Sequence, residues 1–233
     1  WYFQEAYNVA LEGINNAGTN YALLPYYYDV NLGSNDRNKE TLLYADHNET
    51  NEYYNGSSLT YAGGGEADNF AGWMLTWNYT AIKSKNAAGG LVSPVQRESS
   101  QDLGRPWTRM APPIGVFTNT FADKANDSRY DGTFTTVYRG NWNLSGTGLT
   151  DVPILYGANG LPLKPKDAVI SFLDNEPNTA IAYPSGGGDS GIGAGVLPGR
   201  ADYVISPNGI SRIVYPGLWK LGPYRTDNKG SLG

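Results

Sequence analysis

Glycine and proline constrain this chain more than any other feature. The sequence contains 30 glycines and 14 prolines among 233 residues, and they are mixed with Tyr, Trp, Leu and Ile throughout. Glycine weakens the interior of helices and strands, and proline removes a backbone donor, so long regular elements are disfavoured. Because apolar and aromatic residues run along the whole chain, the sequence predicts an ordered but loop-rich protein without repeats or linkers.

Three segments have apolar residues at helical spacing. The first covers residues 2–17, where apolar side chains recur every three or four positions and Gly18 is placed to act as a C-cap. The second covers residues 67–78. The third covers residues 114–121 and follows Pro113, since proline is tolerated in the first turn of a helix.

Several short β-prone runs are separated by Gly, Pro, Asn and Asp clusters that favour turns. They predict small antiparallel ribbons instead of one long sheet. The runs cover residues 40–46, 133–139, 168–173, 179–183, 203–206 and 213–215.

Charge and rare residues exclude several classes of function. The chain has 17 Lys and Arg against 22 Asp and Glu, for a net charge of −5, and it has no basic cluster. Binding to nucleic acid depends on basic side chains that neutralise phosphates, so nucleic acid is not an expected partner. The chain has no cysteine and a single histidine, His47, which excludes disulfides, cysteine nucleophiles and multi-histidine metal sites. We expect no metal and no organic cofactor.

Two catalytic interpretations were weighed. Gly188-Asp-Ser190-Gly resembles the segment around the nucleophilic serine of trypsin-like proteases, with His47 and Asp102 upstream in the matching order. The residues around all three differ from that family, and the stretch is rich in glycine, so we interpret it as a loop. A glycoside hydrolase stays open as an alternative, because the carboxylate pair that it needs is defined only in three dimensions.

The aromatic residues point to carbohydrate. Sugars present apolar C–H faces and hydroxyl edges, so a glycan site needs flat rings flanked by hydrogen-bonding side chains. For any single ring, packing in the core is the alternative interpretation. The candidate ligand-binding residues, which lie in or beside polar segments rich in Asn and Gly, are Tyr53, Tyr54, Trp73, Trp77, Tyr79, Trp107 and Trp142.

The order of several segments resembles the SusD/RagB family of glycan-binding lipoproteins. The matching segments are the opening helix, Tyr21-Ala-Leu-Leu-Pro25, Asn38-Lys-Glu-Thr-Leu-Leu-Tyr44, Arg105-Pro-Trp-Thr108, Asn126-Asp-Ser-Arg-Tyr130 and Pro216-Gly-Leu-Trp-Lys220. The resemblance covers most of the chain in order and implies one SusD-like region over residues 1–233, an internal piece of a longer protein. Residues 1–17 would be the end of its helical repeat part.

That resemblance implies a mainly α fold based on tetratricopeptide helices, most of which lie outside this chain, with extensive loops and short antiparallel β-ribbons. It also implies a non-catalytic protein at the extracellular face of the outer membrane, held there by a lipid anchor that this sequence lacks. Such a protein captures oligosaccharide and delivers it to a TonB-dependent transporter of the SusC type. The alternatives are a glycoside hydrolase acting on polysaccharide and a structural or adhesive surface protein.

Overall fold

The computed structural model describes residues 1–43 and 76–221, with short internal gaps. For residues 181–182, 193–194, 208 and 221 only the backbone is described. In the part of the chain that is described, no helix has both the length and the apolar character needed to cross a bilayer. The gaps are residues 19, 33–34, 36, 99, 101, 104–105, 107–109, 158, 174–180, 183–192, 195–198 and 206.

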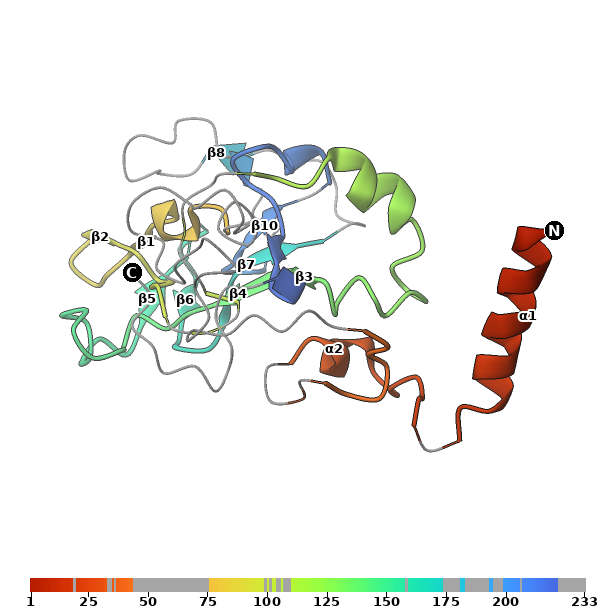
Figure 1. Ribbon diagram of the computed structural model, residues 1–233. Helices are drawn as coiled ribbons and strands as arrows, with labels where there is room; N and C mark the ends of the chain where they lie inside the picture. The colour runs from red at the N-terminus through yellow and green to blue at the C-terminus, as the bar shows by residue number, and fades with distance from the viewer. Residues whose placement is uncertain are drawn as a thin grey trace, which may run out of the picture.

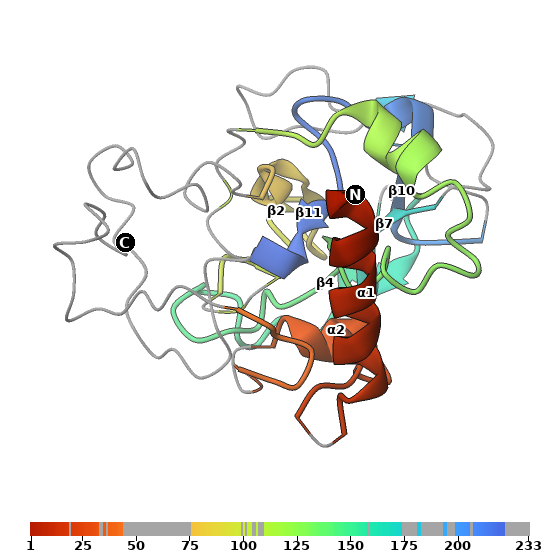
Figure 2. The same cartoon turned by 45° about the vertical axis from the view of Figure 1, so that its right-hand side comes forward.

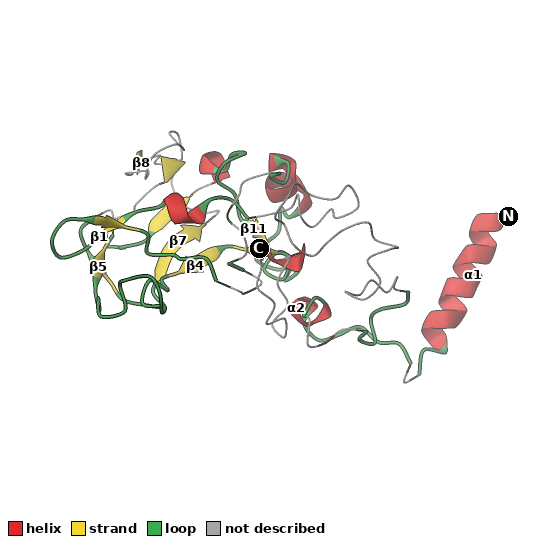
Figure 3. Ribbon diagram, turned by 60° about the vertical axis from the view of Figure 1, so that its left-hand side comes forward, coloured by secondary structure: helices red, strands yellow, loops and turns green. Residues whose placement is uncertain are grey.

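The N-terminal part of the chain is helical. Helix α1 spans Tyr2–Asn15, which confirms the predicted opening helix, although it ends two residues earlier than expected. Its C-cap is Asn16, and Gly18 follows with a positive φ of 54°. The short helix α2 spans Tyr27–Val30. Figures 1 and 3 both show α1 standing apart from the rest of the molecule, whereas the strands gather on the side remote from it.

A three-stranded sheet forms the centre of the body. Its middle strand is β7 (Ala168–Phe172), flanked by β10 (Tyr203–Ile205) in parallel and by β4 (Val137–Arg139) in antiparallel orientation. From Val169 onward every residue of β7 is buried, because the strand lies between two neighbours and carries β-branched and aromatic side chains on both faces. This sheet confirms that the runs at 133–139, 168–173 and 203–206 contain strands, but the parallel pair β7–β10 differs from the antiparallel ribbons that were expected.

The other sheets are smaller. A four-stranded sheet has the order β2-β1-β5-β6, and two further pairs join β11 to β3 and β8 to β9, all antiparallel. The bounds are β1 Ser84–Lys85, β2 Leu91–Val92, β3 Phe134–Thr135, β5 Leu155–Tyr156, β6 Pro162–Leu163, β8 Ile181–Ala182, β9 Gly193–Ala194 and β11 Gly217–Leu218.

Short helical turns complete the body. Three are 3-10 turns and one is a π-helix, which begins just after the predicted start of the third helix. Figures 1 and 2 both place the turns at 114–120 and 207–209 side by side at one edge of the body. The turns are η3 Tyr79–Ala81, η4 Val116–Thr120, η5 Pro207–Gly209 and η6 Trp219–Leu221.

The expected fold class is wrong. The resemblance to the SusD/RagB family implies a mainly α protein, but the described residues form a mixed structure with substantial β-sheet. Most of these strands are only two residues long, so they show no alternating pattern that can be detected in the sequence. The predicted helix at 67–78 lies almost entirely outside the described residues.

Two of the predicted strands differ from the structure. Residues 40–43 form turns and bends, and the rest of that run is not described. Residues 213–215 are not a strand either, since the pairing moves to β11 two residues later, where Gly217 and Leu218 face β3.

Aromatic rings make up much of the main core. The ring centroids of Trp77 and Tyr138 lie 5.7 Å apart, those of Tyr79 and Tyr138 lie 5.2 Å apart, and Phe172 lies 6.1 Å from Trp77. Such edge-on and tilted pairs add about 0.5–1.5 kcal/mol each to the burial of the rings. Because most strands of the body are short, packing between these rings holds much of it together.

Candidate functional site

Three of the predicted ligand-binding residues are buried in the interior. Trp77, Tyr79 and Trp142 have no exposed surface, so no ring face is open to a sugar and the ligand-binding prediction is wrong for them. Tyr79 donates its hydroxyl to the carbonyl of Leu103 at 2.7 Å, and Trp142 donates its indole N–H to the carbonyl of Val152 at 2.9 Å. All three rings are therefore core residues, and Tyr79 and Trp142 have satisfied polar atoms.

The remaining candidates lie outside the described residues. They are Tyr53, Tyr54, Trp73 and Trp107. His47 and Ser190, from the segments that resemble a serine protease, also lie outside the described residues. The predicted aromatic set is therefore not brought together by the described part of the structure.

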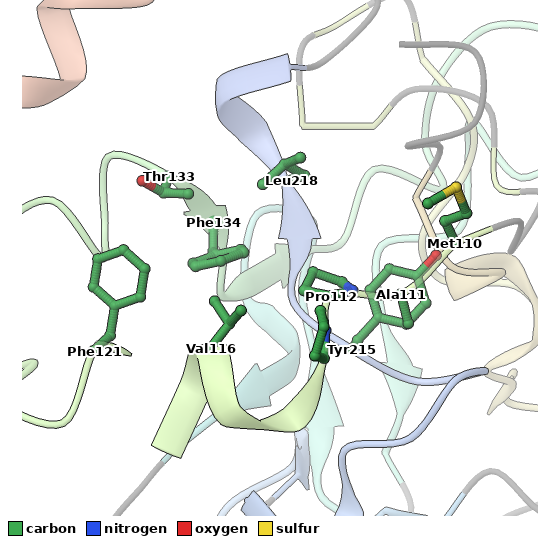
Figure 4. Close-up of a pocket in the computed structure, with 10 residues that line it drawn as sticks. Met110, Ala111, Pro112, Val116, Phe121, Thr133, Phe134, Tyr215 and Leu218 are labelled. Atoms are coloured by element: carbon green, nitrogen blue, oxygen red, sulfur yellow. The ribbon is translucent and has the colours of Figure 1, made fainter. Parts of the chain in front are cut away.

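An apolar cavity of about 330 Å³ opens between η4 and the strands β3 and β11. Figure 4 shows its side chains converging from these elements, with Phe134 between Val116 and Leu218. Among the described residues that line it, none has a carboxylate, amide or basic side chain. A sugar needs hydrogen-bonding partners around its ring, so this cavity does not suit a glycan. Its lining residues are Met110, Ala111, Pro112, Pro113, Val116, Phe121, Thr133, Phe134, Tyr215 and Leu218.

A partly buried lysine contacts a serine, but the geometry of the pair indicates a structural role and not a catalytic one. Burial lowers the pKa of Lys83, whose ammonium group donates to the hydroxyl of Ser93 and to the carbonyl of Thr80. The hydroxyl of Ser93 donates to the same carbonyl at 2.8 Å. Lys83 acts as a donor here, whereas activation of a nucleophile would require it to accept the proton of serine.

The best candidate site is a group of side chains that we call the aromatic corner. It consists of Tyr26, Tyr27 and Tyr28 at the start of α2, together with Trp219 and Lys220 of η6. The three tyrosines follow Pro25, and Tyr26 is the extended N-cap residue of α2. Tyr26 is 71% exposed and Tyr28 is 44% exposed, so two rings of the corner reach solvent.

Stacking on Trp219 fixes the ring of Tyr28. The two ring centroids are 4.0 Å apart and the ring planes differ by 25°. Trp219 itself is only 6% exposed and forms the floor beneath Tyr28. Since one face of Tyr28 is covered by this stack, a ligand can reach the ring only from its edge or its opposite face. The result is a flat ring that is partly exposed and held at a fixed tilt.

A second contact that holds the corner together joins Tyr27 to Lys220. The Lys220 ammonium group donates to the Tyr27 hydroxyl at 2.6 Å and lies 5.3 Å from the centroid of its ring. Lys220 is in turn connected to the body, because its backbone N–H donates to the carbonyl of Thr133. The backbone passes close by at Gly132, where an added Cβ would lie 2.9 Å from Cδ1 of Tyr27 and 3.1 Å from the backbone nitrogen of Tyr28.

Polar side chains fix the loop that carries the corner. The Asn38 side-chain amide donates to the carbonyls of Val30 and Asn35, at 3.1 and 3.0 Å. A carboxylate oxygen of Glu40 accepts the backbone N–H of Leu24 at 2.9 Å. These bonds close the loop around α2 and reduce the ordering that ligand binding would otherwise require.

Charged groups surround the exposed ring of Tyr28. Its pKa is raised by burial first and then by the carboxylates of Asp102 and Asp29. Arg129, whose pKa is influenced by Tyr27 of the corner, forms a two-point pair with Asp127 at 2.8 and 2.7 Å, which lowers the pKa of that carboxyl group. The corner thus combines rings, acceptors and donors. Among the described residues, no group of three His, Asp or Glu side chains could hold a metal ion.

Sequence reasoning missed the aromatic corner as a site. The run of three tyrosines after a proline was visible, as was the Trp-Lys pair of residues 219–220. What the sequence did not reveal is that the two segments, separated by more than 190 residues, stack on each other. A proline followed by consecutive aromatic residues was the available signal.

Comparison with known proteins gives no family. No protein-family model matches the chain, and a search of curated proteins finds no significant match.

Proposed function

We propose that the chain binds oligosaccharide without altering it chemically, at the extracellular face of a bacterial outer membrane, and passes it to a TonB-dependent transporter of the SusC type. The location and the transporter rest on the resemblance of the ordered segments to the SusD/RagB family. The binding itself is supported by the aromatic corner, independently of that resemblance.

The observation that carries the proposal is the stacked ring of Tyr28. A pyranose can lie with its C–H face on the outer side of this ring, as it does on other aromatic platforms. Tyr26 adds a second exposed ring two residues earlier in the chain, and Asp29, whose carboxylate raises the pKa of Tyr28, can accept hydrogen bonds from sugar hydroxyls. Each ring contributes on the order of 1 kcal/mol, so both are needed for useful affinity.

Calorimetric titration tests this proposal. The chain is titrated with maltoheptaose, cellohexaose, xylohexaose and mannohexaose, and each mixture is assayed for new reducing ends. We expect binding of at least one oligosaccharide and no new reducing ends. If reducing ends accumulate with time, the chain is a hydrolase and the proposal fails.

Variants locate the binding. Tyr26→Ala and Tyr28→Ala should each weaken the affinity about fivefold, which corresponds to a loss of about 1 kcal/mol. Leu91→Ala is the matched control, because it removes another exposed apolar side chain, on β2 outside the corner. If both tyrosine variants bind as the control does, the glycan site lies elsewhere.

A further inference from the structure

The apolar cavity between η4 and the strands β3 and β11 has the size of a ligand site. Its volume of about 330 Å³ lies within the range of about 300–1,000 Å³ that is typical of small-molecule pockets. Protein interiors are close-packed and contain few voids larger than a water molecule. A cavity of this volume is therefore larger than an ordinary packing defect, and its walls indicate what it can bind.

Backbone contacts fix the walls of the cavity. The rings of Pro112 and Pro113 fix their own backbone angles, and the carbonyl of Pro113 accepts the N–H of Val116 at 2.9 Å. On the strand side, Leu218 of β11 pairs with Phe134 of β3. Because both sides are held by the backbone, the cavity is largely preformed, which reduces the ordering that a ligand would have to impose.

The π-helix η4 is a second feature that marks the cavity. The backbone N–H of Phe121, its C-cap residue, donates to the carbonyl of Val116 at 3.1 Å, and both residues line the cavity. A π-helix is rare and occurs frequently at functional sites, and its hydrogen bonds span one residue more than those of an α-helix. This extra residue changes the direction of Phe121, whose ring centroid lies 5.7 Å from that of Phe134.

The chemistry of the lining favours an uncharged, flat ligand. Three aromatic rings, those of Phe121, Phe134 and Tyr215, come from different segments and line the cavity together, as Figure 4 shows. None of the ten lining residues has a charged side chain. A carboxylate or ammonium group placed here would lose its water without gaining a partner, which is costly. Aromatic rings, in contrast, pack well against other rings in offset or edge-on arrangements.

The volume indicates the size of the ligand. An engineered apolar cavity of about 150 Å³ in another protein stays free of water and binds benzene, a single ring. The present cavity is roughly twice as large, at about 330 Å³. We therefore expect a ligand of about two rings to fill it.

We propose that this cavity binds a flat, uncharged and mainly apolar molecule of about two fused rings. The cavity shares no residue with the aromatic corner. The inference does not depend on the proposed glycan function.

Methyl NMR tests this proposal on the intact 233-residue chain. The sequence has two methionines, and Met110 lines the cavity, so labelling of the methionine methyl groups with carbon-13 gives a specific probe. The variant Met110→Leu identifies its signal. Indole is the test ligand, and indole-2-carboxylate, which has the same rings and a negative charge, is its charged control.

We expect indole to shift the Met110 signal saturably, with half-saturation below about 1 mM, as is reasonable for so small a ligand. The carboxylate should bind about tenfold more weakly or worse, because its charge has no partner in the cavity.

Larger side chains in the cavity should prevent binding. Val116→Phe and Leu218→Phe each add a ring to a lining position and should weaken indole binding about tenfold or more. Urea titrations show whether each variant is folded, and the two positions lie on different elements. Ile114→Phe is the matched control, because Ile114 is exposed and does not line the cavity. Tyr28→Ala should also bind indole normally, which separates the cavity from stacking on the aromatic corner.

Three results would overturn the inference. The first is a Met110 signal that does not shift in up to about 5 mM indole, a concentration well above the expected half-saturation. The second is equal binding of indole and indole-2-carboxylate. The third is binding of indole by the folded Val116→Phe and Leu218→Phe variants as tightly as by Ile114→Phe. Oligosaccharide titrations are read separately, because the absence of glycan binding would leave each of these results unchanged.

Discussion

Replacing Gly132 by alanine should separate the tyrosines of the aromatic corner from Trp219 and Lys220. The new Cβ would lie 2.9 Å from Cδ1 of Tyr27 and 3.1 Å from the backbone nitrogen of Tyr28, both closer than ordinary contacts. Tyr27 is held in place by its bond from Lys220, and the backbone nitrogen moves only if α2 moves. Overpacking of this kind costs about 1–3 kcal/mol.

The contacts that hold the corner together contribute free energies of similar magnitude. The stack of Tyr28 on Trp219 contributes about 0.5–1.5 kcal/mol beyond burial. The hydrogen bond from Lys220 to Tyr27 contributes on the order of 1 kcal/mol, since it is exposed to solvent. Because the added strain matches the sum of these contacts, α2 should separate from η6 while the sheets stay folded.

Two measurements follow this change in Gly132→Ala. The emission of Trp219 should shift to longer wavelength as its cover is removed, and oligosaccharide affinity should fall about tenfold, in line with a loss of about 1.4 kcal/mol. Gly115→Ala is the matched control, because its added Cβ would meet only the Asn119 side chain at 3.6 Å. Unchanged emission together with affinity within twofold of the control would refute the role of this close approach.

Three further predictions concern the body. Trp142→Ala should lower the free energy of unfolding by about 3–5 kcal/mol in urea titrations but leave glycan affinity unchanged, and an affinity loss without destabilisation would return Trp142 to the site. Asp202→Ala should lower the free energy of unfolding by about 2–4 kcal/mol, because the buried carboxylate accepts a hydrogen bond from the Ser171 hydroxyl at 2.6 Å and two from Arg200. A loss below about 0.5 kcal/mol, which is typical of surface substitutions, would contradict this. Burial raises the pKa of Tyr203 to about 12, from about 10 in the unfolded chain. The contribution of this group to the free energy of unfolding should therefore be constant below pH 10 and fall between pH 10 and 12, by up to about 1.4 kcal/mol per pH unit. A flat profile in urea titrations up to pH 11.5 would count against the burial of this hydroxyl.

The elements that could be predicted from the sequence are those with a local signal. The opening helix has four turns of consistent periodicity, and β7 is a run of mostly β-branched and aromatic residues, so both were found. Strands such as β1 and β2 are two residues long, too short to show a period of their own, and β1 also pairs with the distant β5. The mainly α fold class came from the family resemblance, and the structure contradicts it.

The candidate site differs from its prediction for a similar reason. Sequence context placed Trp77 and Trp142 near polar residues, but in the structure the core surrounds both indoles and leaves neither exposed. Exposure of a ring depends on what packs over it from elsewhere in the chain, which composition does not encode. For the same reason, the stacking of Tyr28 on Trp219 could not be foreseen from either segment alone.

The most direct test of the glycan proposal is an NMR measurement on the chain saturated with the oligosaccharide that binds best in the titrations. If the sugar rests on the corner, nuclear Overhauser effects should connect C–H protons on one face of a pyranose to the ring protons of Tyr28. These effects should disappear in Tyr28→Ala. A bound sugar whose only such contacts are with aromatic rings outside the corner would contradict the account.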